Sequence, residues 1–306
     1  MARLYRFGES FDKRVFSGCS CAFGVFDGYH VGHRLVVDSA RESARREGGD
    51  AVVLTFDVDP DELFRAQELK KLMSNEARIG ALLDSGADAV VVLPFTREFA
   101  SLSPDDFLEL VFGANAPLSL HVGEDFRFGS RASGTVCDLA RWAEGTGTEV
   151  CARPLKELDG APVTSTRIRR ALANCDVKEA SRLLGRLFSI VAPVVEGRRE
   201  GAEMGFATAN LAIPAQLRVL GEGVYAGYAT VDGMRYKAAV SMGASPTFAD
   251  ATSPCEVHLL DFEGDLYGRE LAVELAEFLR PMIKFDSVDE LVATVTGNIQ
   301  WCRDNL

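Results

Sequence analysis

The chain has 306 residues, of which 47% are hydrophobic, so it is longer than one hydrophobic core usually accommodates and two domains are expected. Its 33 basic and 45 acidic residues give a net charge of −12 (33 − 45). This charge repels phosphate backbones and anionic membranes at long range, so neither nucleic acid nor a membrane is an expected partner. A local basic pocket that binds a small phosphate is compatible with this net charge.

Neither the N-terminus nor the cysteines indicate export. The first ten residues contain no apolar segment typical of a signal peptide, and the apolar run Ala89–Leu93 is too short to span a bilayer. Of the seven cysteines only Cys19 and Cys21 are close in sequence, and no second pair completes a tetrahedral zinc site. We therefore expect a soluble, cytoplasmic protein whose cysteines are reduced and mostly buried.

Strand and helix patterns alternate in the first half of the chain. The expected strands lie at residues 21–26, 51–56, 89–93 and 118–122. Helices are expected from Gly32 to Gly48-Gly49, through residues 78–84, and from Ser103-Pro104 onward. This alternation predicts a parallel sheet with helices on both faces.

After Gly185 the pattern changes to short strands joined by turns. Residues 224–231 and 234–240 flank Asp232-Gly233, the strongest short signal for a β-hairpin. A second hairpin is expected between residues 256–262 and the segment from Leu266 onward.

The sequence also predicts two helices in this part of the chain. One spans residues 176–184 and ends at Gly185, and the other follows the capping-box pattern of Ser287 and Glu290. The sequence thus predicts an α/β domain over residues 1–186. An antiparallel β domain closed by a C-terminal helix is predicted over residues 187–306.

The segment of residues 22–37 contains three glycines and two of the chain's four histidines in an apolar frame. Gly24, Gly28 and Gly32 allow tight turns and close approach of a ligand to the backbone. His30 and His33 fall where the first strand ends and a helix begins, which is where open α/β sheets bind ligands and anions. This position indicates a phosphate site. The alternatives are histidines that cap the helix or that bind a metal, although no Cys or carboxylate stands at ligand spacing.

A family resemblance rests on these residues. Gly24-x-Phe26-Asp27-Gly28-x-His30-x-Gly32-His33 resembles the signature of the nucleotidylyltransferase superfamily. More specifically, it resembles the adenylyltransferase half of the bacterial bifunctional riboflavin kinase/FAD synthetase family. Further segments resemble motifs of the same family in the same order, at residues 95–100, 123–134, 164–169, 205–210, 223–226, 241–247, 256–262 and 265–268. The resemblance implies a Rossmann-like nucleotidylyltransferase domain followed by a small antiparallel six-stranded β-barrel kinase domain with a C-terminal helix.

For the first domain, the resemblance implies adenylylation of FMN by ATP, which yields FAD and pyrophosphate. His30 and His33 match the catalytic phosphate-binding pair. The other ATP- and phosphate-binding residues that it implies in this half are Gly24, Phe26, Asp27, Gly28, Gly32, Ser165, Thr166, Arg167 and Arg169. Asp125, Phe126 and Phe128 would bind the flavin. Taken alone, the arginines could equally form a solvated helix face, and the phenylalanines could belong to the core.

For the second domain, the resemblance implies phosphorylation of riboflavin to FMN. Glu256 matches the general base, which the poorly nucleophilic ribityl hydroxyl requires. Gly205, Thr208 and Asn210 match ATP-binding residues, and Thr208 and Asn210 would also hold Mg²⁺. Taken alone, Glu256 could be a solvent-facing strand residue. The expected ligands are riboflavin, FMN and ATP, and the expected state is a monomer or a weak homo-oligomer.

The chain departs from the family pattern at Val58, Asp59, Ala192, Ala202 and Ala207. Asp59 replaces a histidine with a carboxylate that would repel ATP unless Mg²⁺ lies between them. Ala192 stands where a glycine is usual before a turn, Ala202 where an arginine is usual, and Ala207 where a proline is usual. Two alternatives follow: a chain that retains one activity only, or a flavin-binding protein without catalysis. Retention of the matched catalytic residues argues against the second.

Overall fold

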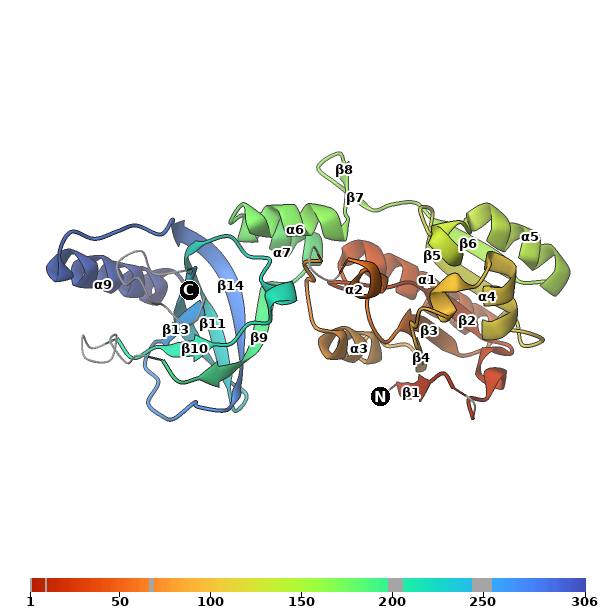
Figure 1. Ribbon diagram of the computed structural model, residues 1–306, viewed down its shortest axis with the longest axis horizontal. Coiled ribbons are helices and arrows are strands. Elements are labelled where there is room, and N and C mark those ends of the chain that lie inside the picture. Colours follow the sequence, from red (N-terminus) through yellow and green to blue (C-terminus); the bar gives the residue numbers. More distant parts are fainter. Residues whose placement is uncertain (1, 9, 66–68, 198–205, 244–254) are drawn as a thin grey trace. The chain divides into compact units, whose positions relative to one another are not determined.

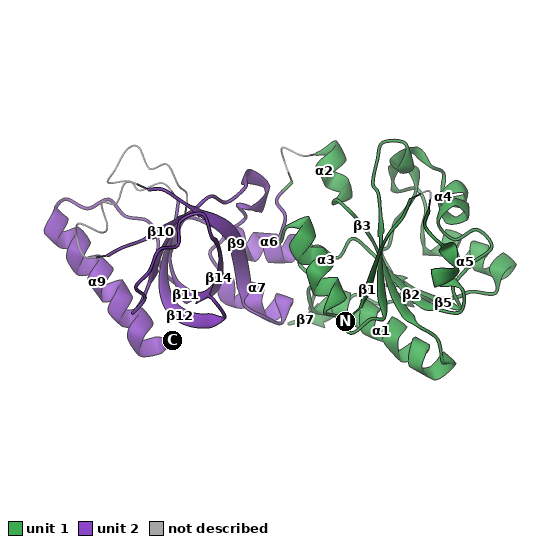
Figure 2. Ribbon diagram, turned by 90° about the horizontal axis from the view of Figure 1, so that it is seen from below, with its two compact units in different colours: residues 1–69, 73–165 green, residues 70–72, 166–306 purple. Residues whose placement is uncertain are grey.

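The computed structural model describes residues 2–8, 10–65, 69–197, 206–243 and 255–306. The chain forms two compact units, one of residues 1–69 and 73–165, the other of residues 70–72 and 166–306 (Figure 2). The predicted boundary between residues 186 and 187 separates the two expected activities, and it stays a prediction.

The first unit is built on a six-stranded sheet in the order β1-β4-β3-β2-β5-β6 (Figure 1). Every neighbouring pair is parallel. The strands are β1 (Arg3–Arg6), β2 (Ser20–Phe23), β3 (Ala51–Phe56), β4 (Ala89–Leu93), β5 (Ser119–Gly123) and β6 (Glu149–Arg153). From β2 the chain continues to β3 on one side and later to β5 on the other. This reversal creates a ligand-binding position at the carboxyl end of β2.

Helices cover both faces of this sheet, as the sequence predicts. On one face, α1 (Val31–Glu47) and α3 (Asn75–Leu83) pack on strand residues such as Ala22 and Val53. On the other, α4 (Pro104–Val111) and α5 (Val136–Thr146) pack on alternate residues such as Phe23 and Leu54. The shorter elements are η1 (Lys13–Phe16), α2 (Pro60–Phe64), η2 (Phe99–Ser101), η3 (Ser130–Ala132), β7 (Glu157–Leu158) and β8 (Ala161–Pro162).

The first expected strand ends earlier than the sequence predicts. It was expected to reach Phe26, but β2 ends at Phe23. Phe26 has a φ of 62° and Gly28 a φ of 79°, and these left-handed conformations are incompatible with an extended strand. The apolar residues that suggested a longer strand therefore belong to the loop that leads into α1.

The second unit is a closed, antiparallel, six-stranded barrel in the order β10-β13-β12-β11-β14-β9. Its strands are β9 (Phe188–Val195), β10 (Ala209–Leu211), β11 (Gly223–Val231), β12 (Met234–Met242), β13 (Cys255–Leu259) and β14 (Glu270–Arg280), with η4 (Ala215–Leu217) between β10 and β11. The barrel that the resemblance implies is thus confirmed. Ala192 lies within β9 and is only 1% exposed, so the expectation that it precedes a turn is wrong.

One of the two expected hairpins forms. β11 and β12 pair across Asp232-Gly233, whose positive φ values of 51° and 77° suit a tight hairpin turn. The prediction of the second hairpin is wrong. β13 pairs with β10 and β12, whereas β14 pairs with β11 and β9. The connecting segment buries Leu260 and Leu266, so it is held by its apolar side chains and allows β14 to close the barrel.

Three longer helices accompany the barrel. α6 (Ser165–Ala173) begins in the first unit and continues in the second, and α7 (Val177–Leu184) ends at Gly185 as expected. α9 (Val288–Asn305) packs Cys302 against Ala226 and Leu260. Its cap differs from the expected box, because the Glu290 carboxylate accepts a hydrogen bond from Asp286 N at 3.1 Å.

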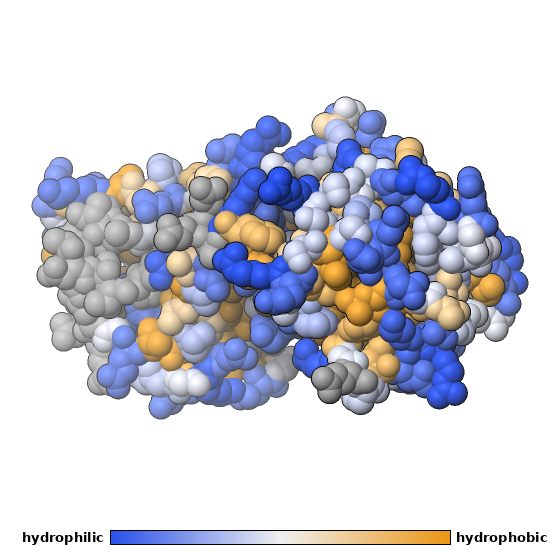
Figure 3. Space-filling model, turned by 45° about the vertical axis from the view of Figure 1, so that its right-hand side comes forward, coloured by the Kyte–Doolittle hydropathy of each residue, from blue (hydrophilic) through white to orange (hydrophobic). Residues whose placement is uncertain are grey.

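Hydrophobic patches interrupt the mainly hydrophilic face shown in Figure 3. Among the helices of the described residues, none is long and apolar enough to cross a membrane. All seven cysteines are free and four of them are buried.

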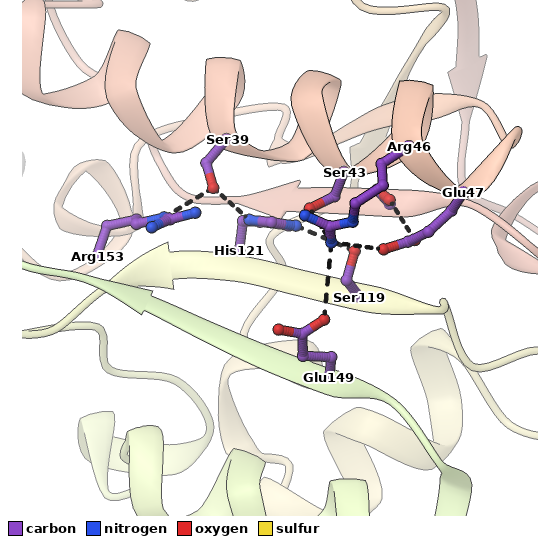
Figure 4. A network of polar contacts seen from close by, with 9 residues as sticks. Ser39, Ser43, Arg46, Glu47, Ser119, His121, Glu149 and Arg153 are labelled. Carbon is purple, nitrogen blue, oxygen red and sulfur yellow. Dashed lines mark hydrogen bonds and ion pairs between the residues drawn. The ribbon is translucent and has the colours of Figure 1, made fainter.

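A polar network centred on the buried His121 joins α1 to β5 and β6 (Figure 4). Arg153 Nε donates to Ser39 Oγ at 2.7 Å, and Ser39 Oγ lies 2.8 Å from Nδ1 of His121. His121 Nε2 lies 3.0 Å from Ser119 Oγ. The arrangement suits a neutral ring that accepts from Ser39 and donates to Ser119. Desolvation, aided by the charge of Arg153, lowers the pKa of His121 to about 4.

This buried histidine predicts a loss of stability in acid. Below pH about 6.5 the unfolded chain binds a proton that folded His121 accepts only near pH 4, so the folded state loses stability as the pH falls through this interval. Between pH 6.5 and 5.0 this histidine should contribute a loss of about 1.5 kcal/mol in the free energy of unfolding. His121→Asn should remove that contribution. Urea unfolding in a Trp301→Phe background, where Trp142 reports on the first unit, measures it. An equal acid dependence in both proteins would contradict the assignment.

Candidate active sites

His30 and His33 lie together at the start of α1. His30 Nδ1 accepts a hydrogen bond from His33 N at 3.3 Å, so His30 caps the helix, and the capping alternative is confirmed for this residue. The two rings stack with centroids 3.5 Å apart, and Phe26 packs edge-on against His33 at 5.4 Å. Because Nδ1 of His30 is an acceptor, its Nε2 is the ring donor. Capping and phosphate binding are therefore compatible functions of one imidazole.

Burial determines the charge of this pair. It lowers the pKa of His33 well below its ordinary value, and the adjacent His30 ring acts in the same direction. In the described part of the chain, the buried Nδ1 of His33 has no hydrogen-bond partner. His33 is therefore neutral at physiological pH, and it can offer a phosphate oxygen a neutral N–H donor rather than a positive charge.

The first and second motifs of the adenylyltransferase half meet in the structure. Ser165, the first residue of α6, donates from Oγ to the carbonyl oxygen of Asp27 at 3.0 Å. Asp27 is 5% exposed, and Gly28 with its positive φ completes the turn before His30. Residues separated by 138 positions in sequence thus form one wall of the candidate site.

The two arginines of the second motif belong to the second compact unit, as does the exposed Thr166. Arg167 forms an ion pair with Glu179 of α7, and Glu179 also accepts from Arg182 at 3.2 Å. Arg169 is half-buried. A phosphate that binds Arg167 must compete with the Glu179 carboxylate.

The residues matched to the flavin loop differ in exposure. Phe128 is 5% exposed and belongs to the core, whereas Phe126 is half-buried and Asp125 is exposed. Phe126 stacks on Phe128 with centroids 5.9 Å apart. A Cβ on Gly134 would lie 2.8 Å from the Phe128 ring, so this glycine lets the loop close on it. Phe126 and Asp125 are the members of the set that a ligand could reach.

In the barrel, the matched kinase residues lie side by side. Asn210 of β10 and Ser241 of β12 each stand opposite Glu256 of β13, so the three side chains share one face. Glu256 is half-buried between the buried Cys255 and Val257, and it therefore points away from the barrel interior.

The residues around Asn210 complete this candidate site. A Cβ on Gly197 would lie 2.1 Å from Asn210 Nδ2, so only a glycine lets the amide rest against this backbone. Thr208 is half-buried and precedes β10 by one residue. Gly205 and Ala202 lie outside the described residues.

Two residues that the sequence interpretation did not single out contact these sites. His258 donates from Nδ1 to the carbonyl oxygen of Ala207 at 2.9 Å, which ties β13 to the residue before Thr208. Arg78, 1% exposed, contacts the loops that follow β2 and β3. The sequence signal that could have identified Arg78 is a single arginine within an apolar helical pattern.

Asp59 has a structural function that the sequence did not predict. Its side chain caps α2 by accepting from Asp61 N at 2.9 Å, and its backbone N–H donates to Glu62 Oε1 at 3.0 Å. Asp59 is 7% exposed, and its negative charge opposes the lowering of the pKa of Arg78 by burial. The Asp59 carboxylate thus caps a helix and lies in the field of a buried positive charge, which the sequence did not predict. The neighbouring Val58 N–H donates to Asp57 Oδ1 at 2.8 Å.

Comparison with known proteins first identifies each half. A family model described as FAD synthetase matches residues 12–167, and one described as riboflavin kinase matches residues 184–306. A crystal structure from Streptococcus pneumoniae, described as a macrolide-efflux protein, shares the fold with a TM-score of 0.85. Its identity is 29%, and the match covers 98% of this chain and 99% of that one.

Relatives then identify the whole chain. Proteins named bifunctional riboflavin kinase/FMN adenylyltransferase match it in Pseudomonas fluorescens with 35% identity, over 94% of this chain and 92% of the relative. The protein of that name in Listeria monocytogenes has 33% identity, over 92% of this chain and 90% of the relative. The chain belongs to the family of bifunctional riboflavin kinase/FMN adenylyltransferases.

The packing at Gly32 makes a testable prediction. A Cβ at this position would lie 3.2 Å from His30 Cε1 and Nδ1, so Gly32→Ala must displace the ring that caps α1. FAD formation should fall about tenfold, because small displacements of catalytic groups are costly. Thermal stability should change little, because the weakened His30 cap and the better helix propensity of Ala have opposite effects of about 1 kcal/mol each. Gly80→Ala in α3, where a Cβ has open space, is the matched control. It should keep the parent rate and stabilise the fold by about 0.5–1 kcal/mol. Parent-like FAD formation by Gly32→Ala would contradict the importance of the ring position.

Proposed function

We propose that this chain converts riboflavin to FMN and FMN to FAD, using ATP and Mg²⁺ in both steps. The observation that carries the proposal is the convergence of separated motifs into two sites, one at the carboxyl end of β2 and one on the β10-β13-β12 face of the barrel. We place adenylylation in residues 1–186 and riboflavin phosphorylation in residues 187–306. A cytoplasmic location fits the proposed use of these small ligands, and a monomer or weak homo-oligomer suffices for both reactions.

In adenylylation, an oxygen of the FMN phosphate attacks the α-phosphorus of ATP, and the bond to the bridging oxygen breaks to release pyrophosphate. His30 and His33 donate neutral N–H hydrogen bonds to phosphate oxygens as charge builds on them. The left-handed turn at Phe26 and Gly28 exposes the backbone to the nucleotide. Gly24 and Gly32 provide room for the Phe26 and His30 rings.

The remaining residues of this site bind the other charges and the flavin. Asp27 and Ser165 hold the loop and the start of α6 together. Arg167 and Arg169, after Thr166 on α6, attract the leaving pyrophosphate. Phe126 with Asp125 contacts the flavin ring, and Phe128 supports Phe126 from the core.

In the kinase reaction, Glu256 accepts the proton of the ribityl 5′-hydroxyl as its oxygen attacks the γ-phosphorus, and ADP leaves. Thr208 and Asn210 offer neutral oxygens that would hold Mg²⁺ together with the ATP phosphates. In the described part of the chain no three His, Cys, Asp or Glu side chains are grouped to hold a metal ion. When bound, Mg²⁺ neutralises phosphate charge. Gly205, which lies outside the described residues, is proposed as an ATP-binding residue.

Glu256→Gln tests the base assignment because it preserves the shape of the side chain and removes its basicity. Riboflavin phosphorylation should fall about 10²–10⁴-fold, whereas riboflavin binding and FAD formation from supplied FMN should stay near the parent values. Both rates are measured by chromatography in one preparation. Glu270→Gln on β14, an exposed position, is the matched control and should leave both rates unchanged.

Three outcomes contradict this account in different ways. Parent-rate phosphorylation by Glu256→Gln would remove this residue from the mechanism. Loss of both activities would indicate misfolding, which a thermal melt would reveal. A parent protein that makes FMN without FAD would instead support the one-activity alternative.

A further inference from the structure

Arg78 of α3 is a buried arginine that contacts two neighbouring strand ends. Its Nη1 donates to the carbonyl oxygen of Val25 at 3.0 Å and to Thr55 Oγ1 at 2.7 Å. Thr55 Oγ1 in turn donates to the same Val25 oxygen at 3.3 Å. One guanidinium nitrogen and one hydroxyl thus fix the first residues of the loop that contains Asp27, Gly28 and His30.

The second guanidinium nitrogen extends the contact to β3. Nη2 donates to the carbonyl oxygens of Phe56 at 2.9 Å and Asp57 at 3.3 Å. The Asp57 carboxylate accepts from Phe95 N at 2.8 Å, and Phe95 follows β4. The loops after β2, β3 and β4 are therefore joined through one charged side chain and one carboxylate.

The charge of Arg78 is balanced within the protein. Burial lowers its pKa, and the carboxylates of Asp59, Asp27, Glu62 and Asp57 oppose that effect. Arginine stays protonated at any ordinary pH, so these carboxylates meet a permanent positive charge. An apolar residue of similar length would remove the Arg78 donors from the carbonyl oxygens of Phe56 and Asp57 and leave Val25 O with the Thr55 hydroxyl.

We propose that Arg78 is a positioning residue for adenylyl transfer, which holds the β2–α1 loop so that the backbone and the His30 ring face the triphosphate. The proposal rests on the adenylyltransferase function proposed above. Lysine cannot replace the guanidinium, because a single ammonium group cannot donate in a fixed fork to Val25 on one loop and to Phe56 on the next. Arg78 itself contacts backbone and polar groups of the protein, so its effect on the reaction is indirect.

The test compares Arg78→Lys and Arg78→Met with the full-length parent. Arg78→Lys should lower the kcat of FAD formation about tenfold and raise its KM for ATP about fivefold or more. Arg78→Met should lose about a hundredfold in kcat, the scale of a displacement of about 1 Å at a reacting group. Riboflavin phosphorylation in the same preparations should stay within about twofold of the parent rate. Arg141→Lys, at an exposed arginine paired with Asp138, is the control and should match the parent.

A merely structural role predicts a different result. Partial unfolding reduces the concentration of active enzyme, so it lowers the apparent kcat and leaves KM unchanged. Parent values of both constants in the Arg78 variants, or a loss of kcat that equals the unfolded fraction at unchanged KM, would overturn the proposal. A parent protein that forms no FAD would overturn the adenylyltransferase function first, and with it this inference.

A milder pair of variants decides the question if the Arg78 variants do not fold. Thr55→Val removes the hydroxyl that links Arg78 to Val25 and nearly preserves the side-chain shape, whereas Thr55→Ser retains the hydroxyl. Thr55→Val should lower FAD formation about fivefold and raise the KM for ATP, and Thr55→Ser should stay near the parent. Equal FAD formation by the two folded variants would overturn the proposal.

Discussion

In the proposed reaction, adenylyl transfer depends on one constraint: the ends of three parallel strands must be held in fixed positions at the carboxyl edge of the sheet. Backbone carbonyls at such an edge have no further strand to pair with, so they need other donors. Arg78 supplies donors to the ends of β2 and β3, and Asp57 connects β3 to β4. We propose that this edge presents the turn at Gly28 and the stacked histidines to the nucleotide.

The stacked histidines follow from this arrangement. Two imidazoles with centroids 3.5 Å apart cannot both become charged without repulsion, and burial further disfavours protonation of His33. Because burial and the adjacent His30 ring keep the pKa of His33 well below its ordinary value, its ring stays neutral near neutral pH. In the proposed site the positive charge comes from other elements.

The barrel solves a different problem. Its candidate base Glu256 and candidate metal ligand Asn210 come from strands that are separated in sequence, and strand pairing places Asn210 and Ser241 opposite Glu256. Here the positions are fixed by strand register. Gly197 and His258 support this face, the first by leaving room for the Asn210 amide and the second by anchoring the Ala207 carbonyl.

Local sequence patterns predict most of the helices and strands. They predict less well which strands pair when the strands are far apart in the sequence. Asp232-Gly233 has a conformation that few other residues accept, so its hairpin could be recognised from four residues of sequence. The pairing of β14 with β11 and β9 depends on barrel closure, which no local signal encodes. The site motifs were recognisable from residue type and order. The functions of Arg78 and Asp59 were not, because they depend on carbonyls and charges that only the folded chain brings together.

The central claim is that one chain performs two different transfers from ATP. Incubation of the full chain with riboflavin, Mg²⁺ and ATP labelled at either the γ- or the α-phosphorus, followed by separation of the flavins, tests it most directly. The account predicts γ-label in both FMN and FAD and α-label in FAD alone, because FAD retains the FMN phosphate and gains the adenylyl group. Label in FMN without any labelled FAD, or no labelled flavin at all, would contradict it.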